Sequence, residues 1–93
     1  MDIQERRCFL EELSREFSAG TLSISDAVIR LREDVTGMPQ GVFAAMCKIS
    51  IRTLRRLELG ESNPTVQTLN AIFKPFGMQI GIIRRPRARD ELI

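Results

Sequence analysis

The chain has 93 residues, of which 43% are hydrophobic, 5% aromatic and 28% charged, and its formal net charge is +2. This length indicates one domain, and the hydrophobic content excludes wholesale disorder. The sequence has no His, no Gly-rich phosphate loop and no paired metal-ligand spacing, so we expect no catalytic residue, no metal and no cofactor.

The charge is divided unevenly along the chain. Residues 1–36 carry eight acids and five arginines, a net charge of −3, whereas residues 37–93 carry nine bases and four acids, a net charge of +5. Because phosphates attract basic surfaces, a nucleic acid is expected to approach the second part. The absence of a signal core and of a run of ~20 apolar residues predicts a cytoplasmic protein without a membrane partner. Neither Cys8 nor Cys47 stands in a metal-like or redox pair, so no disulfide is expected.

Two helices are predicted in the acidic first part. Residues 3–18 place four apolar side chains on one stripe, and Ala19-Gly20 ends this helix; the stripe is Ile3, Leu10, Leu13 and Phe17. Ser23 begins the next helix, with Asp26 completing a partial capping box, and Thr36-Gly37 ends it. Its inner stripe is Ile24, Ala27, Val28, Leu31 and Val35.

Residues 40–60 predict two short helices joined by a tight turn. Pro39 suits the first turn of the first of these helices, and Ser50 is a good N-cap for the second. The buried positions of this pair are Phe43, Ala44, Cys47, Ile49, Leu54 and Leu57. For Cys47, the expected role is that of a small core residue.

The second of these helices presents Arg52, Arg55 and Arg56 on its outer side. An outward helix with three guanidiniums on a two-helix platform is what reading of the DNA major groove requires. Glu58 lies in the last turn, where the helix dipole disfavours an acid. Its position therefore suggests a second role, bonding a nearby backbone amide or an arginine.

A fifth helix and one strand complete the predicted elements. Pro64 or Thr65 opens the helix, which ends near Lys74-Pro75, where the proline should distort the last turn. Residues 78–84 alternate in a period of two, which places Met78, Ile80 and Ile82 on one face of a strand. A lone strand cannot satisfy its backbone, so we expect an antiparallel ribbon between two copies, the alternative being a strand packed loosely on its own helices.

The stretch 40–60 resembles the helix-turn-helix of the Cro/CI-type (XRE-like, lambda-repressor-like) DNA-binding proteins. The resemblance extends over roughly residues 23–77. Its matching positions are Gln40, Ala44, Leu54 with Leu57, Glu58 with Gly60, Ile29-Arg30-Leu31-Arg32-Glu33, Asn63 to Leu69, and Phe76-Gly77. In one departure Lys48 replaces the turn glycine, at a position that favours φ > 0. The strand also resembles the C-terminal strand of HipB-type antitoxins.

The resemblance implies an all-α, lambda-repressor-like helix-turn-helix fold of about five helices plus one C-terminal β-strand that pairs between subunits. It divides the chain into an extra N-terminal helix (1–20), the helix-turn-helix domain (21–77), a dimerisation strand (78–84) and a basic tail (85–93). The tail either touches phosphates as an arm or is a solvated terminus.

The family pattern also assigns contacts to double-stranded DNA. Base edges would be read by Ser50, Ile51, Arg52 and Arg56, although Ile51 could instead tuck under the turn. Phosphates would be held by Gln40, Lys48, Thr53 and Arg55. A dimer would read two half-sites about 34–36 Å apart.

Two functional classes follow. The first is a transcriptional regulator, a repressor that acts as a homodimer. The second is an antitoxin that binds a protein toxin and regulates its own operon, for which Phe9, Leu10, Leu13 and Phe17 of the first helix would supply a partner surface. This helix could equally pack on its own domain or extend the dimer interface. A helix-turn-helix reused only for protein contact is a third reading, which the basic recognition helix opposes.

Overall fold

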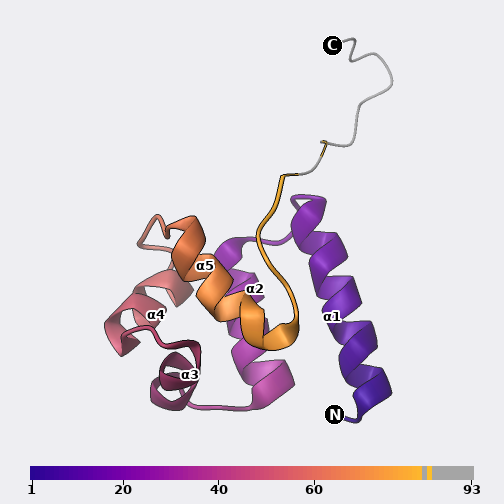
Figure 1. Ribbon diagram of the computed structural model, residues 1–93, viewed down its shortest axis with the longest axis horizontal. Coiled ribbons are helices and arrows are strands. Elements are labelled where there is room, and N and C mark those ends of the chain that lie inside the picture. The colour runs from indigo at the N-terminus through magenta and orange to yellow at the C-terminus, as the bar shows by residue number, and fades with distance from the viewer. Residues whose placement is uncertain (83, 85–93) are drawn as a thin grey trace.

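The computed structural model describes residues 1–82 and 84. Within this range the helices are α1 (Ile3–Ser18), α2 (Ile24–Arg30), η1 (Leu31–Thr36), α3 (Gln40–Cys47), α4 (Ile51–Glu58), α5 (Val66–Phe73) and η2 (Lys74–Phe76) (Figure 1). The mostly helical class and the five expected helices are confirmed. None of the helices in this part of the chain is long and apolar enough to cross a membrane.

Polar side chains fix the helix starts as the sequence predicts. Ser23, Ser50 and Thr65 each have extended backbone angles and accept a hydrogen bond from the backbone N–H three residues later. The prediction for Pro39 is wrong by one position: this residue is extended (φ −62°, ψ 159°) and precedes the first helical residue, Gln40. Because proline fixes only φ, its ψ is free to take the value of a cap residue.

The helix predicted over residues 23–36 changes its winding halfway. α2 is followed without a break by η1, a six-residue π-helix that ends at Gly37 (φ 66°). At this end the Thr36 hydroxyl donates to the carbonyl of Arg32 (2.6 Å) and accepts from the N–H of Met38 (3.1 Å). The wider winding was not expected, because an i→i+5 bonding pattern leaves no signature in the spacing of apolar residues.

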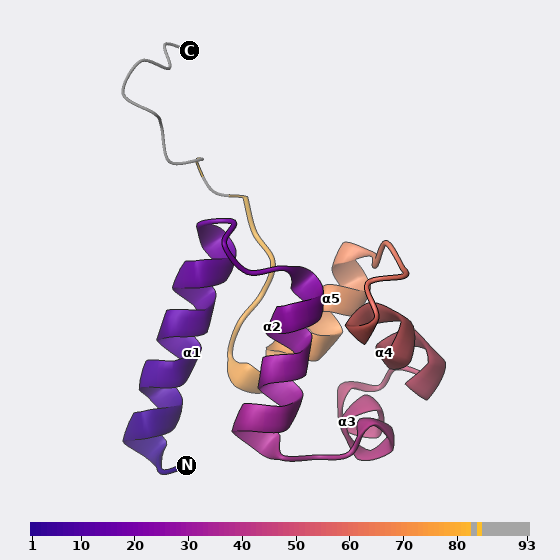
Figure 2. The same cartoon turned by 180° about the vertical axis from the view of Figure 1, so that it is seen from behind.

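The hydrophobic core is formed around α2, which lies between α1 on one side and α3 and α4 on the other (Figure 2). Its fully or nearly fully buried members come from every helix of the described range: Leu13, Leu22, Ala27, Val28, Leu31, Phe43, Ala44, Cys47, Leu54, Leu57, Leu69, Ile72, Phe73 and Phe76. A single continuous core therefore joins the elements that carry the helix-turn-helix to the N-terminal helix.

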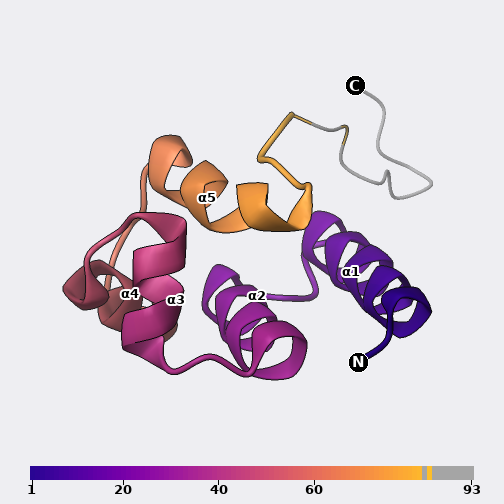
Figure 3. The ribbon, with the colours of Figure 1, turned by 60° about the horizontal axis from the view of Figure 1, so that its bottom comes forward.

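The N-terminal helix packs on the side of the domain away from α4 (Figure 3). The ring of Phe17 lies 6.1 Å from that of Phe73, and the Arg6 guanidinium lies 5.8 Å from the centre of the Phe76 ring. Ile3 departs from the predicted stripe, since its side chain is 81% exposed. Among the described residues, the apolar side chains of α1 that pack in the core begin at Phe9, so Ile3 lies before the buried part of the helix.

Residues 78–82 follow η2 as an extended segment without regular strand structure, and the expected strand is not confirmed in the part of the chain described. Met78 and Ile80 are half-buried and pack against the core, and the N–H of Ile80 donates to Oδ1 of Asn70 (2.7 Å). Ile82, in contrast, is fully exposed. Pairing between subunits involves a second chain and stays a prediction. The basic tail, residues 85–93, lies outside the described residues.

Candidate nucleic-acid interface

The turn between α3 and α4 is built on one left-handed residue. Lys48 has φ 60° and ψ 40°, which makes it the one non-glycine residue with positive φ among those described. The N–H of Ile49 bonds the carbonyl of Ala44 (3.0 Å), which closes the end of α3. Lysine therefore occupies the position where the resemblance expects glycine, with the positive φ that this position favours. The conformation costs about 1–2 kcal/mol for a residue with a Cβ.

The inner faces of the two helices meet in the core. Phe43 and Leu54 are completely buried, Ala44, Cys47 and Leu57 nearly so, and Ile49 is half-buried at the junction. Burial raises the pKa of the Cys47 thiol to about 11, so this side chain is neutral at physiological pH. A neutral buried thiol packs as a small hydrophobic group and is a poor nucleophile.

The outer face of α4 is strongly basic. Arg52, Arg55 and Arg56 are all exposed, and none of the described carboxylates lies within 4 Å of their guanidiniums. Guanidiniums that are free of acidic partners keep their hydrogen-bond donors available for an anion or a base edge. The helix therefore combines an apolar face held by the core with a cationic face directed to solvent.

The start of α4 places the remaining predicted base contacts. Ser50 Oγ accepts from the N–H of Thr53 (3.0 Å) and donates to its hydroxyl (2.8 Å), so both hydroxyls take part in the helix cap. Ile51 is 37% exposed. Its Cδ1 lies close to Gly41 of α3, 3.6 Å from the position that a side-chain Cβ would take at this residue. Part of Ile51 thus covers the start of α3, while the rest faces solvent.

Glu58, at the end of α4, is the acceptor of a hydrogen-bonded ion pair. Arg32 of η1 donates from Nε to Oε2 (2.7 Å) and from a terminal nitrogen to Oε1 (2.9 Å), the two-point geometry of a guanidinium and a carboxylate. Gln40 Nε2 also donates to Oε1 (3.0 Å), and Arg55 Nε donates to Gln40 Oε1 (3.4 Å). The second role expected for Glu58 is therefore the binding of an arginine.

Opposing influences act on the ionisation of this pair. Burial alone would raise the pKa of Glu58, but the hydrogen bonds from Arg32 and Gln40 and the charge of Arg32 outweigh it and lower that pKa. The hydrogen bond to Glu58 raises the pKa of Arg32. Both groups are consequently charged at neutral pH, with side chains only 13% (Arg32) and 7% (Glu58) exposed.

A small hollow lies beside the basic face. It has a volume of about 230 Å³ and is lined by Arg52, Thr53 and Arg56 on one side and by residues 62–65, with Thr68, on the other. The loop before α5 thus continues the surface formed by α4. This hollow could not be predicted from the sequence, because its two sides are brought together only when the loop folds back on α4.

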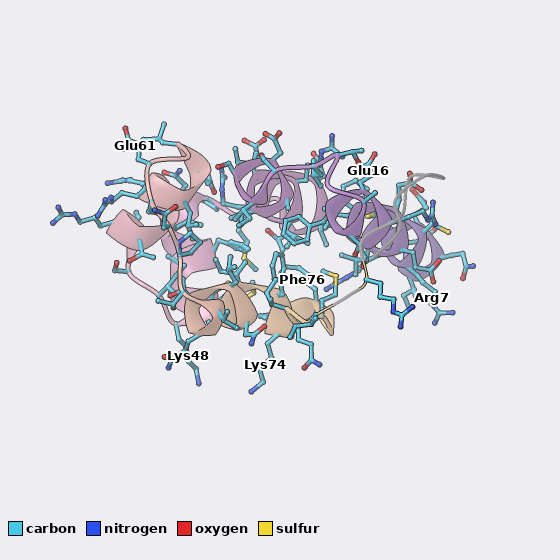
Figure 4. All side chains as sticks on the ribbon, turned by 90° about the horizontal axis from the view of Figure 1, so that it is seen from above. Arg7, Glu16, Lys48, Glu61, Lys74 and Phe76 are labelled. Atoms are coloured by element: carbon cyan, nitrogen blue, oxygen red, sulfur yellow. The ribbon has the colours of Figure 1, made fainter. Side chains whose placement is uncertain are left out.

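Two lysines project from one side of the molecule. Lys48, from the turn, and Lys74, from η2, project from the same side of the molecule, whereas Glu61 projects from the opposite side (Figure 4). Phe76 points toward the interior in the same view, where it packs on Phe43 with ring centres 6.2 Å apart. The predicted phosphate residue Lys48 is therefore directed to solvent and has no acid beside it among the described residues.

The predicted site residues fall into two groups. Gln40 and Arg55, both predicted phosphate contacts, lie within hydrogen-bonding distance of each other. The predicted dimerisation residues lie apart from them, in the segment that passes α1. Two residues that shape these regions were not singled out: Arg32, whose partner Glu58 is 26 positions away, and Asn70, which holds Ile80. Contacts of such sequence separation carry no local signal.

Comparison with known proteins agrees with this geometry. A search of curated proteins and a search of solved structures each gave no match. The helix-turn-helix family model matches residues 30–83, which is more than half of the chain and includes η1 and all helices from α3 to η2. The chain therefore belongs to the helix-turn-helix family of DNA-binding transcriptional regulators, and its resemblance to the Cro/CI-type proteins is confirmed.

Proposed function

We propose that this protein is a repressor that binds a specific DNA sequence as a homodimer, with α4 in the major groove. Support comes chiefly from one observation: the three arginines of α4 are exposed and free of described acidic partners, on a helix whose opposite face is fixed in the core. In this arrangement the positively charged side of the helix meets DNA without rearrangement of the fold.

The base-reading residues are Ser50, Ile51, Arg52 and Arg56. Arg52 and Arg56 lie one helical turn apart, so both can enter the groove, and a guanidinium pairs with O6 and N7 of guanine. Ser50 caps the helix through its hydroxyl, which limits it to one further hydrogen bond at most. The exposed part of Ile51 is suited to a thymine methyl group.

The phosphate-binding residues are Gln40, Lys48, Thr53 and Arg55. Gln40 is the first residue of α3, where the free backbone N–H groups and the helix dipole favour an anion, so its phosphate contact is through the backbone while its amide bonds Glu58 and Arg55. Lys48 supplies a charge from the turn. These contacts position the protein on the duplex and carry no sequence information directly.

A gel shift with DNA from upstream of its own gene tests this function. The binding reaction contains an excess of random competitor DNA and is repeated with the double variant Arg52→Ala/Arg56→Ala. A competitor-resistant band that the double variant loses is the expected result. A wild-type protein that shifts no fragment more strongly than the competitor would argue against sequence-specific binding.

The homodimer is proposed to form through residues 78–84, paired antiparallel. Met78 and Ile80 pack on the domain's own core, whereas Ile82 is fully exposed, so Ile82 is the residue of this apolar face that is accessible to a second chain. Ile82→Asp is a better test than Ile80→Asp, because Ile80 also packs on the domain's own core. Light scattering should give a dimer mass for the wild type and a monomer mass for Ile82→Asp. An unchanged mass in the variant would refute the proposal that residues 78–84 pair between two copies.

An antitoxin that binds a protein toxin is the second candidate, favoured by the exposure of Ile82 in the segment that resembles the HipB-type strand. The apolar side of α1 does not add to it. Leu13 is buried, and Phe9, Leu10 and Phe17 pack on the domain's own core. A toxin-like gene next to this one, and retention of its product by the purified protein, would favour the antitoxin over a free-standing repressor.

A further inference from the structure

Four side chains from three helical elements form one continuous chain of hydrogen bonds. It leads from Arg32 in η1 to Glu58 at the end of α4, then to Gln40 at the start of α3, and finally to the exposed Arg55 on the outer face of α4. Its inner end is almost buried, and its outer end lies on the surface proposed to face DNA. The chain thus connects the core with a proposed DNA contact.

The donor and acceptor chemistry leaves only one orientation for the central amide. A carboxylate can only accept hydrogen bonds, so the NH₂ group of Gln40 must face Glu58. A guanidinium can only donate, so the carbonyl oxygen of Gln40 must face Arg55. Both requirements are met at once by the observed contacts, Nε2 to Glu58 at 3.0 Å and Oε1 to Arg55 Nε at 3.4 Å.

The Glu58 carboxylate is itself held in a fixed orientation. Arg32 holds both of its oxygens, and the same guanidinium also donates to the carbonyl of Met38 (3.1 Å). Met38 lies two residues before Gln40, so one guanidinium fixes both the loop that enters α3 and the group that Gln40 bonds. Gln40 is therefore held at its backbone and at its amide.

From this geometry we infer that Gln40 and Glu58 are positioning residues that direct the Arg55 guanidinium toward DNA. The Nε–H of Arg55 is engaged with Gln40, so the four N–H bonds of its two terminal nitrogens remain for a phosphate. Arg52 and Arg56 lack such an anchor among the described residues. Arg55 is consequently the one preorganised arginine of the three, and its binding costs less side-chain entropy.

The first test needs no DNA. Gln40→Met removes the amide but keeps the length of the side chain and both Arg32–Glu58 hydrogen bonds, so the domain should fold, as its melting temperature will show. Side-chain NMR of the ¹⁵N-labelled chain then compares hydrogen exchange at Nε of Arg55 and Arg52. In the wild type, the Nε–H of Arg55 should exchange at least about threefold more slowly than the Nε–H of Arg52. In Gln40→Met the two exchange rates should be equal. Equal rates in the wild type would overturn the inference.

The second test rests on the proposed function and uses a duplex that the wild-type protein selects from a random pool. Fluorescence anisotropy should show that Gln40→Met weakens binding about three- to tenfold when Arg55 is present and less than about twofold in an Arg55→Ala background. Arg56→Ala is the matched control background, in which the full loss should persist. Equal losses in the Arg55→Ala and Arg56→Ala backgrounds would contradict the inference, because a direct phosphate contact of the Gln40 amide would not depend on Arg55.

The two tests separate the inference from the proposed function. If the wild-type protein selects no sequence, the proposed function fails, while the exchange rates still decide whether Gln40 positions Arg55. If it selects a sequence but the losses are equal, the function stands and the positioning role is refuted.

Discussion

Replacing Arg32 by Met should destabilise the domain strongly, because it leaves the Glu58 carboxylate in a site where only 7% of the side chain is exposed. The variant loses two hydrogen bonds to the carboxylate and one to the carbonyl of Met38, while Gln40 remains as a donor to Glu58. Breaking a buried ion pair by removing one partner costs about 3–5 kcal/mol. With one donor retained, we expect the lower end, about 3 kcal/mol.

This loss is large compared with the total stability of such a domain, which is about 5–14 kcal/mol at the usual ~0.05–0.15 kcal/mol per residue. Urea denaturation at pH 7, followed by circular dichroism, measures it as a fall in the midpoint at an unchanged slope. Arg15→Met is the matched control. Arg15 pairs with Glu12 on the surface of α1, where both side chains are more than half exposed, so its loss should stay below about 0.5 kcal/mol.

A double variant, Arg32→Met/Glu58→Leu, distinguishes the ion pair from simple packing. When both charges are removed, no uncompensated carboxylate remains, so the double variant should be more stable than Arg32→Met alone. If Arg32→Met costs no more than the control, or if the two single losses simply add in the double variant, the buried charge is not the cause and the reasoning fails.

Four further outcomes are expected. Because the folded-state pKa of Glu58 is lowered, its stabilisation is present above its ordinary pKa of 4.5 and disappears as the pH falls below it, so the Arg32→Met deficit should be smaller at pH 3 than at pH 7 in urea titrations. Lys48→Gly should raise the urea midpoint, by about 0.5–1 kcal/mol in stability, because glycine tolerates the positive φ. Leu13→Ala should cost about 2–4 kcal/mol by thermal unfolding, whereas Ile3→Ala, at an exposed site, should change stability by less than about 0.5 kcal/mol. Arg52→Ala should cost about 1–3 kcal/mol of binding in anisotropy titrations and relax the preference at one base pair; unchanged affinity for selected and random DNA would withdraw Arg52 from the base contacts.

The helix starts and the turn were predictable because their causes are local. A Ser or Thr hydroxyl that bonds the N–H three residues later acts within a single turn, and the same is true of the left-handed glycines that follow α1, η1, α4 and η2. The unusual conformation of Lys48 could be predicted from the resemblance, since the position and not the residue type calls for positive φ. Pro39 shows the limit of prediction from local sequence. Proline suits either the cap or the first helical position, and its extended ψ of 159° makes it the cap.

Features that depend on distant partners could not be predicted in the same way. The position of Glu58 indicated an arginine partner, but nothing near it in the sequence could identify Arg32, 26 residues earlier. The alternation at Met78, Ile80 and Ile82 predicted an extended segment with one apolar face. The same pattern fits a segment that packs on its own core and one that pairs with another chain, and the structure places Met78 and Ile80 on the core while Ile82 remains exposed.

The acid on α4 illustrates how the needs of the fold and of DNA binding are combined in one helix. Glu58 reduces the positive charge of the helix and stands at its unfavourable end, so on electrostatic grounds alone a basic residue would serve DNA binding better. Its carboxylate, however, bonds η1 through Arg32 and α3 through Gln40, while Ser25 of α2 bonds the neighbouring carbonyl of Leu57 (2.8 Å). These bonds fix the end of α4 to the three elements that precede it. A recognition helix held in this way keeps its basic face in a set position, and the contacts that it makes with DNA need not compensate for ordering the helix itself.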